Sequence, residues 1–297
     1  MRVRTLAAVL LTGALALTAC GKEGAPADQG AAPAGLFEVA KDVAVAGSPT
    51  FDKAKSRGSL IVGVKEDQPG LGYKDPTTNK YSGFDIDIAK LISAKLGFDP
   101  EKIQYKTVQS AAREQALING DVDYYVGTYT INAGRKEKVA FAGPYFVAGQ
   151  DLLVKKDNTD ITGPDALKGK KVCSVTGSTP AKNVKEKGLT EPGNVLEFQG
   201  YSQCVTKLLN GEVDAVTTDD AILKGYAAAE EGKLKVVGKT FSSEPYGIGL
   251  PKDDKALRDK VNDILQSSLD DGTWQKIYDG TLGKSGSSAE KPKIDRY

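Results

Sequence analysis

A repeated motif leads to a polar side chain in each half of the chain. Residues 117–123 read Leu-Ile-Asn-Gly-Asp-Val-Asp, and residues 208–214 read Leu-Leu-Asn-Gly-Glu-Val-Asp. Each copy predicts a helix that ends at Asn-Gly and a strand that begins at Val-Asp, with Thr128 and Asp219 five residues beyond the final aspartate. Ligands bind outside the carboxyl ends of strands in open α/β sheets. The two polar residues therefore indicate two walls of one crevice. Taken alone, the repeat is also explained by coincidence, because Asn-Gly is a common way to end a helix.

Two further segments carry groups that suit a small polar ligand. Thr128 and Thr130 lie two positions apart in an extended stretch, so both hydroxyls point to the same side. The run Thr-Gly-Ser-Thr-Pro at 176–180 predicts a helix N-terminus, in which Thr179 can cap and Pro180 takes the first helical position. The free N–H groups of such a terminus favour an anion. Buried threonines that satisfy backbone groups, and an ordinary helix start, are the structural alternatives.

The residue inventory excludes several classes of chemistry. The chain has no histidine, which rules out Ser-His-Asp and Cys-His mechanisms and imidazole metal ligands. Its 40 basic and 39 acidic residues give a formal charge of +1, so we expect no nucleic-acid partner. The sequence contains no phosphate-binding P-loop, and we expect neither a metal nor a cofactor.

The elements that position these residues alternate between strands and helices. The length of 297 residues favours two domains or lobes. The β-branched run at 58–64 predicts a buried strand, and the apolar residues of 83–97 recur on one face of a predicted helix. The alternation continues along the chain, which is typical of α/β layers with parallel strands.

The N-terminal segment indicates export and lipid attachment. Two arginines precede an apolar stretch at 6–17 that is too short to span a bilayer comfortably. The sequence Leu-Thr-Ala-Cys-Gly at 17–21 looks like a bacterial lipobox. Residues 1–19 are then a signal peptide, and Cys20 carries a lipid that anchors the protein at the extracellular face of the cytoplasmic membrane. A plain signal peptide with a chance cysteine is the alternative.

An exterior location sets expectations for the next segment and for the other two cysteines. Residues 20–50 are rich in Ala, Gly and Pro, which predicts a flexible linker between the lipid and the folded part. Cys173 and Cys204 remain as an even pair in an oxidising compartment, which predicts a disulfide. Two buried free thiols are the alternative.

Segments along most of the chain carry a resemblance to a known family. They are Gly-Phe-Asp-Ile-Asp at 83–87, Thr-Tyr-Thr-Ile-Asn-Ala-Gly-Arg at 128–135, Phe-Ala-Gly-Pro-Tyr-Phe at 141–146, Cys-Ser-Val-Thr-Gly-Ser-Thr-Pro at 173–180 and Thr-Thr-Asp-Asp at 217–220. With these motifs the chain resembles the extracytoplasmic solute-binding proteins, family 3, of polar amino-acid ABC importers. It is most similar to the glutamate-binding lipoproteins of Gram-positive bacteria.

The resemblance implies an α/β fold of the periplasmic-binding-protein type II class, a two-lobed clamp with two crossover hinge segments. We place the first lobe at 51–147 plus 246–283, the second lobe at 148–245 and a C-terminal tail at 284–297. The crossings are expected near 146–150 and 242–247.

The resemblance also implies which residues hold the backbone groups of an amino acid. Arg135 matches the family position that grips the α-carboxylate, for which a planar guanidinium fork is suited. Ser178 and Thr179 would meet the same carboxylate from the second lobe. Asp219 matches the aspartate that accepts from the α-ammonium group, and its neighbour Asp220 is expected to cap the following helix. A solvated helix face is the alternative for Arg135 taken alone.

Three other types of contact would select the ligand's side chain. Lys65 and Arg113 match positions that meet the side-chain carboxylate in family members that bind glutamate or aspartate. Tyr201 replaces a polar residue of other acidic-ligand relatives and is expected to donate a hydrogen bond. Phe84 is expected to pack on the ligand methylenes, with an ordinary core position as the alternative.

These residues imply a binding protein rather than an enzyme. The expected function is extracellular capture of L-glutamate, or aspartate, by a monomer that delivers it to an ABC permease driven by a separate ATPase. An enzyme of the same fold, such as a dehydratase, is a second hypothesis, but it needs a general acid or base that no residue marks here. A sensor or adhesin module is the third.

Overall fold

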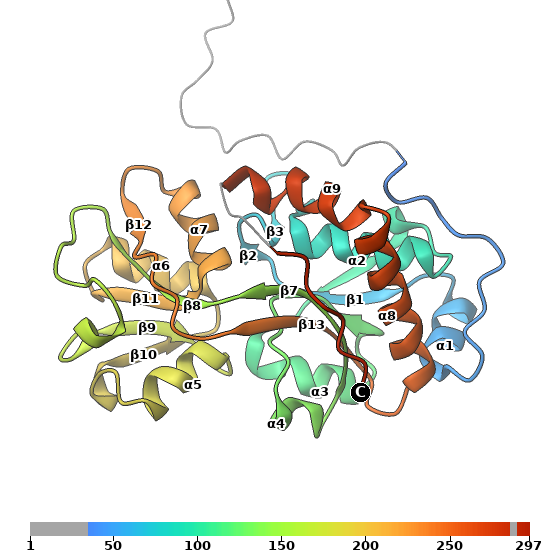
Figure 1. Ribbon diagram of the computed structural model, residues 1–297, viewed down its shortest axis with the longest axis horizontal. Coiled ribbons are helices and arrows are strands. Elements are labelled where there is room, and N and C mark those ends of the chain that lie inside the picture. The colour runs from blue at the N-terminus through green and yellow to red at the C-terminus, as the bar shows by residue number, and fades with distance from the viewer. Residues whose placement is uncertain (1–34, 286–289) are drawn as a thin grey trace, which may run out of the picture.

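The computed structural model describes residues 35–285 and 290–297, and these residues form two lobes (Figure 1). Each lobe is built on one five-stranded mixed sheet with helices packed against it. The two-lobed α/β architecture that the sequence predicts is therefore confirmed. The predicted signal peptide and Cys20 lie outside the described residues.

The sheet of the first lobe has the order β5-β1-β6-β13-β7, in which the first three strands are parallel and β13 is antiparallel to both neighbours. Its strands are β1 (Ile61–Val64), β5 (Gln104–Thr107), β6 (Tyr124–Tyr125), β7 (Ala140–Ala148) and β13 (Glu244–Leu250). A separate small sheet on this lobe has the order β2-β3-β4 and is formed by β2 (Asp67–Gln68), β3 (Gly72–Lys74) and β4 (Tyr81–Ser82).

The sheet of the second lobe repeats this design with the order β10-β9-β11-β8-β12. Here β10, β9 and β11 are parallel, and β8 is antiparallel to both of its neighbours. Its strands are β8 (Gln150–Lys155), β9 (Val172–Val175), β10 (Val195–Phe198), β11 (Ala215–Asp219) and β12 (Leu234–Val236).

The helices divide between the lobes as the strands do. Those that accompany the first sheet are α1 (Pro49–Arg57), α2 (Phe84–Lys95), α3 (Arg113–Ile118), α4 (Ala133–Lys136), α8 (Lys255–Asp270) and α9 (Thr273–Gly280). Those that pack on the second sheet are α5 (Thr179–Glu186), α6 (Tyr201–Leu209) and α7 (Asp220–Ala229).

The repeated sequence motif occupies the same place in both lobes. In each copy the helix ends just before Asn-Gly, and the glycine has a positive φ, 68° in the first copy and 75° in the second. The Asp123 carboxylate accepts from the Ile61 N–H at 2.7 Å, where β1 begins. The Asp214 carboxylate accepts from the Lys171 N–H at the same distance, just before β9. The motif therefore ties a helix exit to the start of a neighbouring parallel strand in both lobes.

Two strands of the first sheet lead into the second lobe (Figure 1). β7 ends at Ala148 and β8 begins at Gln150, so one residue separates the two sheets at this crossing. β13 returns antiparallel to β7, with Glu244 opposite Ala148. The predicted crossings at 146–150 and 242–247 coincide with these strand ends. The predicted lobe boundaries fall inside β7 and β13 because both strands extend across the junction.

The predicted disulfide is confirmed. Cys173 on β9 and Cys204 on α6 are joined with an Sγ–Sγ distance of 2.03 Å. The bond ties α6 to the sheet of the second lobe.

The described end of the predicted linker is packed against the first lobe. The Ala40 N–H donates to the Ala94 carbonyl at 2.9 Å. The Ser48 hydroxyl donates to Asp254 at 2.8 Å and accepts from the Phe51 N–H, so that Ser48 caps α1. Within the predicted linker, Ala40 and Ser48 therefore contact α2 and the start of α8.

The C-terminal residues lie beside β7, the edge strand of the first sheet (Figure 1). The Asp295 N–H donates to the Gly143 carbonyl at 2.8 Å, and the Tyr297 hydroxyl accepts from the Phe141 N–H at 2.8 Å. The Tyr297 ring also contacts the guanidinium of Arg258. None of the helices in the described ranges has the length and apolar character that a membrane span requires.

Candidate functional site

A small cavity of about 10 Å³, room for about one water molecule, lies between the lobes and is lined by most of the predicted binding residues. We call it the cleft site. Its first-lobe wall comes from the α3 region and the segment after β6, and its second-lobe wall from the starts of α5, α6 and α7. The lining residues are Ser110, Arg113, Thr128, Thr130, Arg135, Ser178, Thr179, Pro180, Tyr201, Asp219 and Ile222. The expectation that the ends of β6 and β11 face one crevice therefore agrees with the structure.

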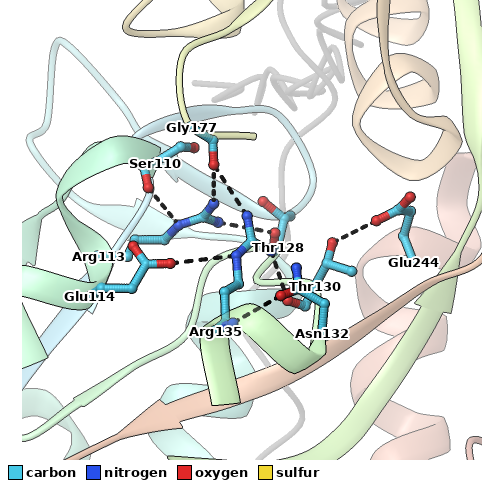
Figure 2. A network of polar contacts seen from close by, with 9 residues as sticks. All are labelled: Ser110, Arg113, Glu114, Thr128, Thr130, Asn132, Arg135, Gly177 and Glu244. Carbon is cyan, nitrogen blue, oxygen red and sulfur yellow. Dashed lines mark hydrogen bonds and ion pairs between the residues drawn. The ribbon is translucent and has the colours of Figure 1, made fainter. Parts of the chain in front are cut away.

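Arg135 lies in the first-lobe wall, where several polar contacts hold its side chain (Figure 2). The Asn132 side chain caps α4 by accepting from the Arg135 N–H at 2.9 Å. The guanidinium donates to the Thr130 carbonyl at 2.7 Å and to the Gly177 carbonyl at 3.1 Å. Glu114 lies 3.5 Å from its Nε. Burial lowers the pKa of Arg135 to about 10, so the group remains charged at neutral pH.

Arg113 lies beside Arg135 and points to the same carbonyl (Figure 2). Its guanidinium donates to the carbonyls of Ser110 at 3.0 Å, Thr128 at 3.4 Å and Gly177 at 3.3 Å. Both guanidiniums also contact the Tyr129 ring, whose centroid lies 4.3 Å from the Arg113 Cζ and 4.9 Å from the Arg135 Cζ. Two cations therefore share a buried wall that contains mainly neutral carbonyl acceptors, an arrangement that favours an anionic ligand group.

Lys65 reaches the cleft site through another residue. It follows β1, is 3% exposed, and donates from Nζ to the Ser110 hydroxyl at 2.9 Å. Ser110 lines the cavity, whereas Lys65 itself does not. Burial, followed by repulsion from Arg113, lowers the pKa of Lys65 to about 7. A carboxylate placed near Ser110 would restore the charge on this amine.

Asp219 offers an acceptor on the opposite wall. One carboxylate oxygen accepts from the Tyr246 hydroxyl at 2.7 Å, whereas Oδ1 is buried and has no hydrogen-bond partner. Burial, and then the nearby Glu244, raise the pKa of Asp219 to about 8. A buried acceptor without a partner costs free energy, which an incoming ammonium group would recover.

The start of α5 supplies donors but differs from the prediction in its cap. Ser178, not Thr179, is the N-cap: its backbone is extended, and its hydroxyl accepts from the Ala181 N–H at 3.1 Å. Thr179 and Pro180 are the first two residues of the helix. The Thr179 hydroxyl, freed from capping, is buried without a hydrogen-bond partner. It is therefore available to a ligand in the cavity.

The predicted role of Asp220 is also wrong. Asp219 precedes α7 in extended conformation, and Asp220 is the first residue of the helix. The Asp220 carboxylate accepts from the Gly149 N–H at 3.1 Å and pairs with Lys224 at 2.6 Å. It therefore fixes the crossing between β7 and β8 rather than capping α7.

The structure places Tyr201 in the wall of the cavity and Phe84 in the hydrophobic core. Tyr201 begins α6 and lines the cavity, and burial raises the pKa of its hydroxyl to about 12, so it remains a donor. Phe84 does not line the cavity. It is fully buried at the start of α2, where its ring packs against Tyr145, Phe146 and Trp274. The structure therefore places Phe84 in the ordinary core, which corrects the expected contact with ligand methylenes.

Two buried acids support the threonines of the first-lobe wall and were not nominated from the sequence. Thr128 has φ +47°, a conformation that is unfavourable for a β-branched residue. The Asp85 carboxylate accepts from the Thr128 N–H at 3.1 Å and from the Tyr145 hydroxyl at 2.7 Å. Glu244, on β13, accepts from the Thr130 hydroxyl at 2.8 Å (Figure 2). The sequence offered one signal for Glu244: an acidic residue inside the predicted crossing at 242–247.

The described residues contain no group of three or more His, Cys, Asp or Glu side chains that could hold a metal ion. The arrangement at the cleft site instead pairs two guanidiniums on one wall with an unpaired carboxylate oxygen on the other. Such a site matches a small zwitterion by charge and by hydrogen bonding.

Comparisons with known proteins agree with this description. Residues 60–284 match the model of the bacterial extracellular solute-binding proteins, family 3. The chain is 43% identical over 249 residues to the glutamate-binding protein GluB of Corynebacterium glutamicum, covering 80% of this chain and 83% of the relative. It is 42% identical over 252 residues to the glutamine-binding protein of Geobacillus stearothermophilus, covering 84% and 92%.

A solved structure shares both the fold and much of the sequence. An ancestral arginine-binding protein bound to arginine superposes with a TM-score of 0.69 and 39% identity, covering 75% of this chain and 97% of that one. The matched family is one of binding proteins rather than enzymes. The chain therefore belongs to the bacterial extracellular solute-binding proteins, family 3.

Proposed function

We propose that this protein captures L-glutamate, or a closely related acidic amino acid, outside the cell and delivers it to an ABC importer. Binding of a polar amino acid for import is the coarser function that its relatives have in common. Glutamate is the finer choice, and it rests on the charges around the cleft site.

The observation that carries the proposal is the separation of charge across the cavity. Arg135 and the start of α5 offer donors for an α-carboxylate, and the unpaired Oδ1 of Asp219 accepts from an α-ammonium group. Arg113 and Lys65 then supply two further cationic groups. A ligand with a second carboxylate gives these groups a counterion, whereas a neutral side chain leaves them uncompensated.

Glutamine is the second candidate. The relative from Geobacillus stearothermophilus is named a glutamine-binding protein at nearly the same identity as GluB. The lowered pKa of Lys65, about 7, also allows this amine to be neutral beside an amide. The side-chain contacts of Lys65 and Arg113 decide between the two ligands.

The lipid anchor and the partners complete the proposal. Cys20 carries the lipid after removal of residues 1–19, which keeps the protein at the extracellular face of the cytoplasmic membrane. The permease and its ATPase are separate chains. The protein acts as a monomer and uses no cofactor.

Calorimetric titration with a panel of amino acids tests the function. The panel is L-glutamate, L-aspartate, L-glutamine, L-arginine and glycine, measured on the wild type and on Arg135→Ala, Lys65→Met and Arg113→Met. Arg135→Ala should weaken every ligand about a hundredfold or more, because it strips the partner from a buried charge. Lys65→Met and Arg113→Met should weaken glutamate far more than glutamine. Equal losses for both ligands in these two variants would contradict the placement of the side-chain pocket.

A further inference from the structure

The hairpin that contains Asp67 makes a contact between the lobes outside the cleft site. The Asp67 carboxylate accepts from the Ser202 N–H at 3.1 Å and from the Ser202 hydroxyl at 3.2 Å. Its carbonyl accepts from the Tyr226 hydroxyl. Asp67 belongs to β2 of the first lobe, whereas Ser202 and Tyr226 lie on α6 and α7 of the second lobe. Asp67 does not line the cavity.

Helix α6 receives side-chain contacts at its N-terminus from both lobes: Gln203 of the helix accepts from the Gly200 N–H at 3.1 Å, and Asp67 of the first lobe accepts from the Ser202 N–H. Its N-cap residue is Gly200, which has no side chain, and Ser202 is the second residue of the helix. Helix N-termini leave N–H groups that Asp and Asn side chains satisfy well, and a carboxylate also suits the positive end of the helix dipole. Asp67 fills this position across the junction between the lobes. The Asp67 cap therefore exists only when the lobes are together, whereas the Gln203 contact does not depend on closure.

Glycines at the junction allow the lobes to approach this closely. A Cβ at Gly200 would lie 2.6 Å from the Asp67 carboxylate, and one at Gly225 would lie 2.1 Å from the Pro69 carbonyl oxygen. Gly225 is in the middle of α7, where glycine costs up to about 1 kcal/mol of helix stability relative to alanine. The close approach of Pro69 accounts for a glycine at this position.

We propose that Asp67 is a positioning residue that latches the closed clamp, and that Gly200 and Gly225 form its seat on the second lobe. The latch rests on the proposed function, because it acts on a clamp that holds an amino acid. A contact present only in the closed state shifts the equilibrium between open and closed lobes without touching the ligand. It therefore sets the affinity and the release rate for every ligand by the same factor, while the cleft site sets which ligand is chosen.

Stopped-flow fluorescence on the wild type and on four variants tests the latch. The probe is L-glutamate, or L-glutamine if the wild-type chain prefers it in the titration, so the outcome does not depend on the specificity proposed above. Asp67→Ala should raise the dissociation rate about tenfold with little change in the association rate. Asp67→Asn should stay within about twofold of the wild type, because asparagine caps a helix as well as aspartate does.

Gly225→Ala separates the latch from a merely structural role. In the ligand-free protein this change should raise the melting temperature, because alanine favours the helix. With ligand it should raise the dissociation rate at least tenfold, because the new methyl group meets Pro69 only on closure. Gly280→Ala is the matched control: its Cβ would meet nothing within 4 Å, and its rates should equal those of the wild type. Wild-type dissociation rates in both Asp67→Ala and Gly225→Ala would overturn the proposal.

Discussion

Asp219, the proposed acceptor for the ligand's α-ammonium group, is kept in place at a cost to the stability of the fold. Its buried Oδ1 has no partner, and its pKa is raised to about 8. The folded state holds the proton of the Asp219 carboxyl more tightly than the unfolded state does. The contribution of this protonation to the free energy of unfolding is therefore complete below pH 4 and is lost as the pH rises through 8.

Asp219→Asn should therefore stabilise the ligand-free protein at pH 8, by about 1 to 3 kcal/mol, and much less at pH 5. The same variant should weaken amino-acid binding about a hundredfold or more, because an amide does not neutralise the α-ammonium group. Thermal unfolding followed by circular dichroism at both pH values, together with calorimetric titration, measures the two effects. Parallel shifts at pH 5 and pH 8 would mean that Asp219 is ionised in the ligand-free fold.

The protonation of Lys65 should depend on the charge of the ligand's side chain. At pH 8 the free amine is mostly neutral, because its pKa is about 7. A side-chain carboxylate should raise the pKa of Lys65. The protein should therefore take up about one more proton when it binds glutamate than when it binds glutamine. Titrations at pH 8 in buffers of different ionisation enthalpy measure the number, and Lys65→Met should abolish the difference. The same proton count for both ligands in the wild type would place the carboxylate elsewhere.

At this scale the sequence predicted residue types better than their exact roles. Eight of the nominated binding residues line one cavity: Arg113, Thr128, Thr130, Arg135, Ser178, Thr179, Tyr201 and Asp219. Phe84 was misassigned because a phenylalanine at a helix start gives the same pattern in a core as in a pocket. Glu244 was missed because its role depends on pairing with Thr130 across more than a hundred residues of sequence.

Among the elements, α6 is held to its lobe by a covalent bond. The Cys173–Cys204 disulfide spans a sequence separation of 31 residues, which in the chain-entropy account corresponds to about 3 to 4 kcal/mol.

Reduction of this bond, or the pair of changes Cys173→Ser and Cys204→Ser, should lower the melting temperature of the protein. The order of ligand preference should remain the same, because neither cysteine lines the cleft site. Differential scanning calorimetry and titration of the variant with glutamate and glutamine provide the measurements. A change in which ligand binds more tightly would show that the bond also shapes the site.

The elements themselves were largely predictable, and their caps were not. The run at 58–64 contains β1, and the predicted helix at 83–97 contains α2, because periodicity reports burial directly. The caps of α5 and α7 were assigned one residue late, since Ser178 and Asp219 compete with polar neighbours that are equally good caps in sequence.

The whole molecule is a two-lobed clamp, and the guanidiniums of Arg113 and Arg135 in the first lobe both donate to the Gly177 carbonyl of the second lobe. Closure buries these two cations, which costs free energy unless a ligand anion accompanies them. Small-angle X-ray scattering should therefore show compaction on addition of saturating L-glutamate, and much less with glycine. An unchanged radius of gyration with bound glutamate would contradict closure by ligand.

At the scale of the molecule, the repeated motif predicted two lobes with a shared design, and the two mixed sheets have corresponding strand orders. The contacts between lobes could not be predicted, because Asp67 and Ser202 become neighbours only through the crossings. The contacts of the segments at 35–50 and 290–297 could not be predicted either, since their small and polar residues carry no periodic pattern.

Asp295 and Tyr297 bond to the edge of the first sheet, which affects the order in which the molecule folds. Strands β8 to β12 are continuous in sequence, so the second lobe can fold before the C-terminal segments of the first lobe are in place. The first lobe needs β13, α8 and α9, and two groups of β7, the Gly143 carbonyl and the Phe141 N–H, acquire their partners only when Asp295 and Tyr297 are in place. Until then β7 presents an open strand edge to other emerging chains. Folding therefore protects this edge only after Asp295 and Tyr297 have docked on β7.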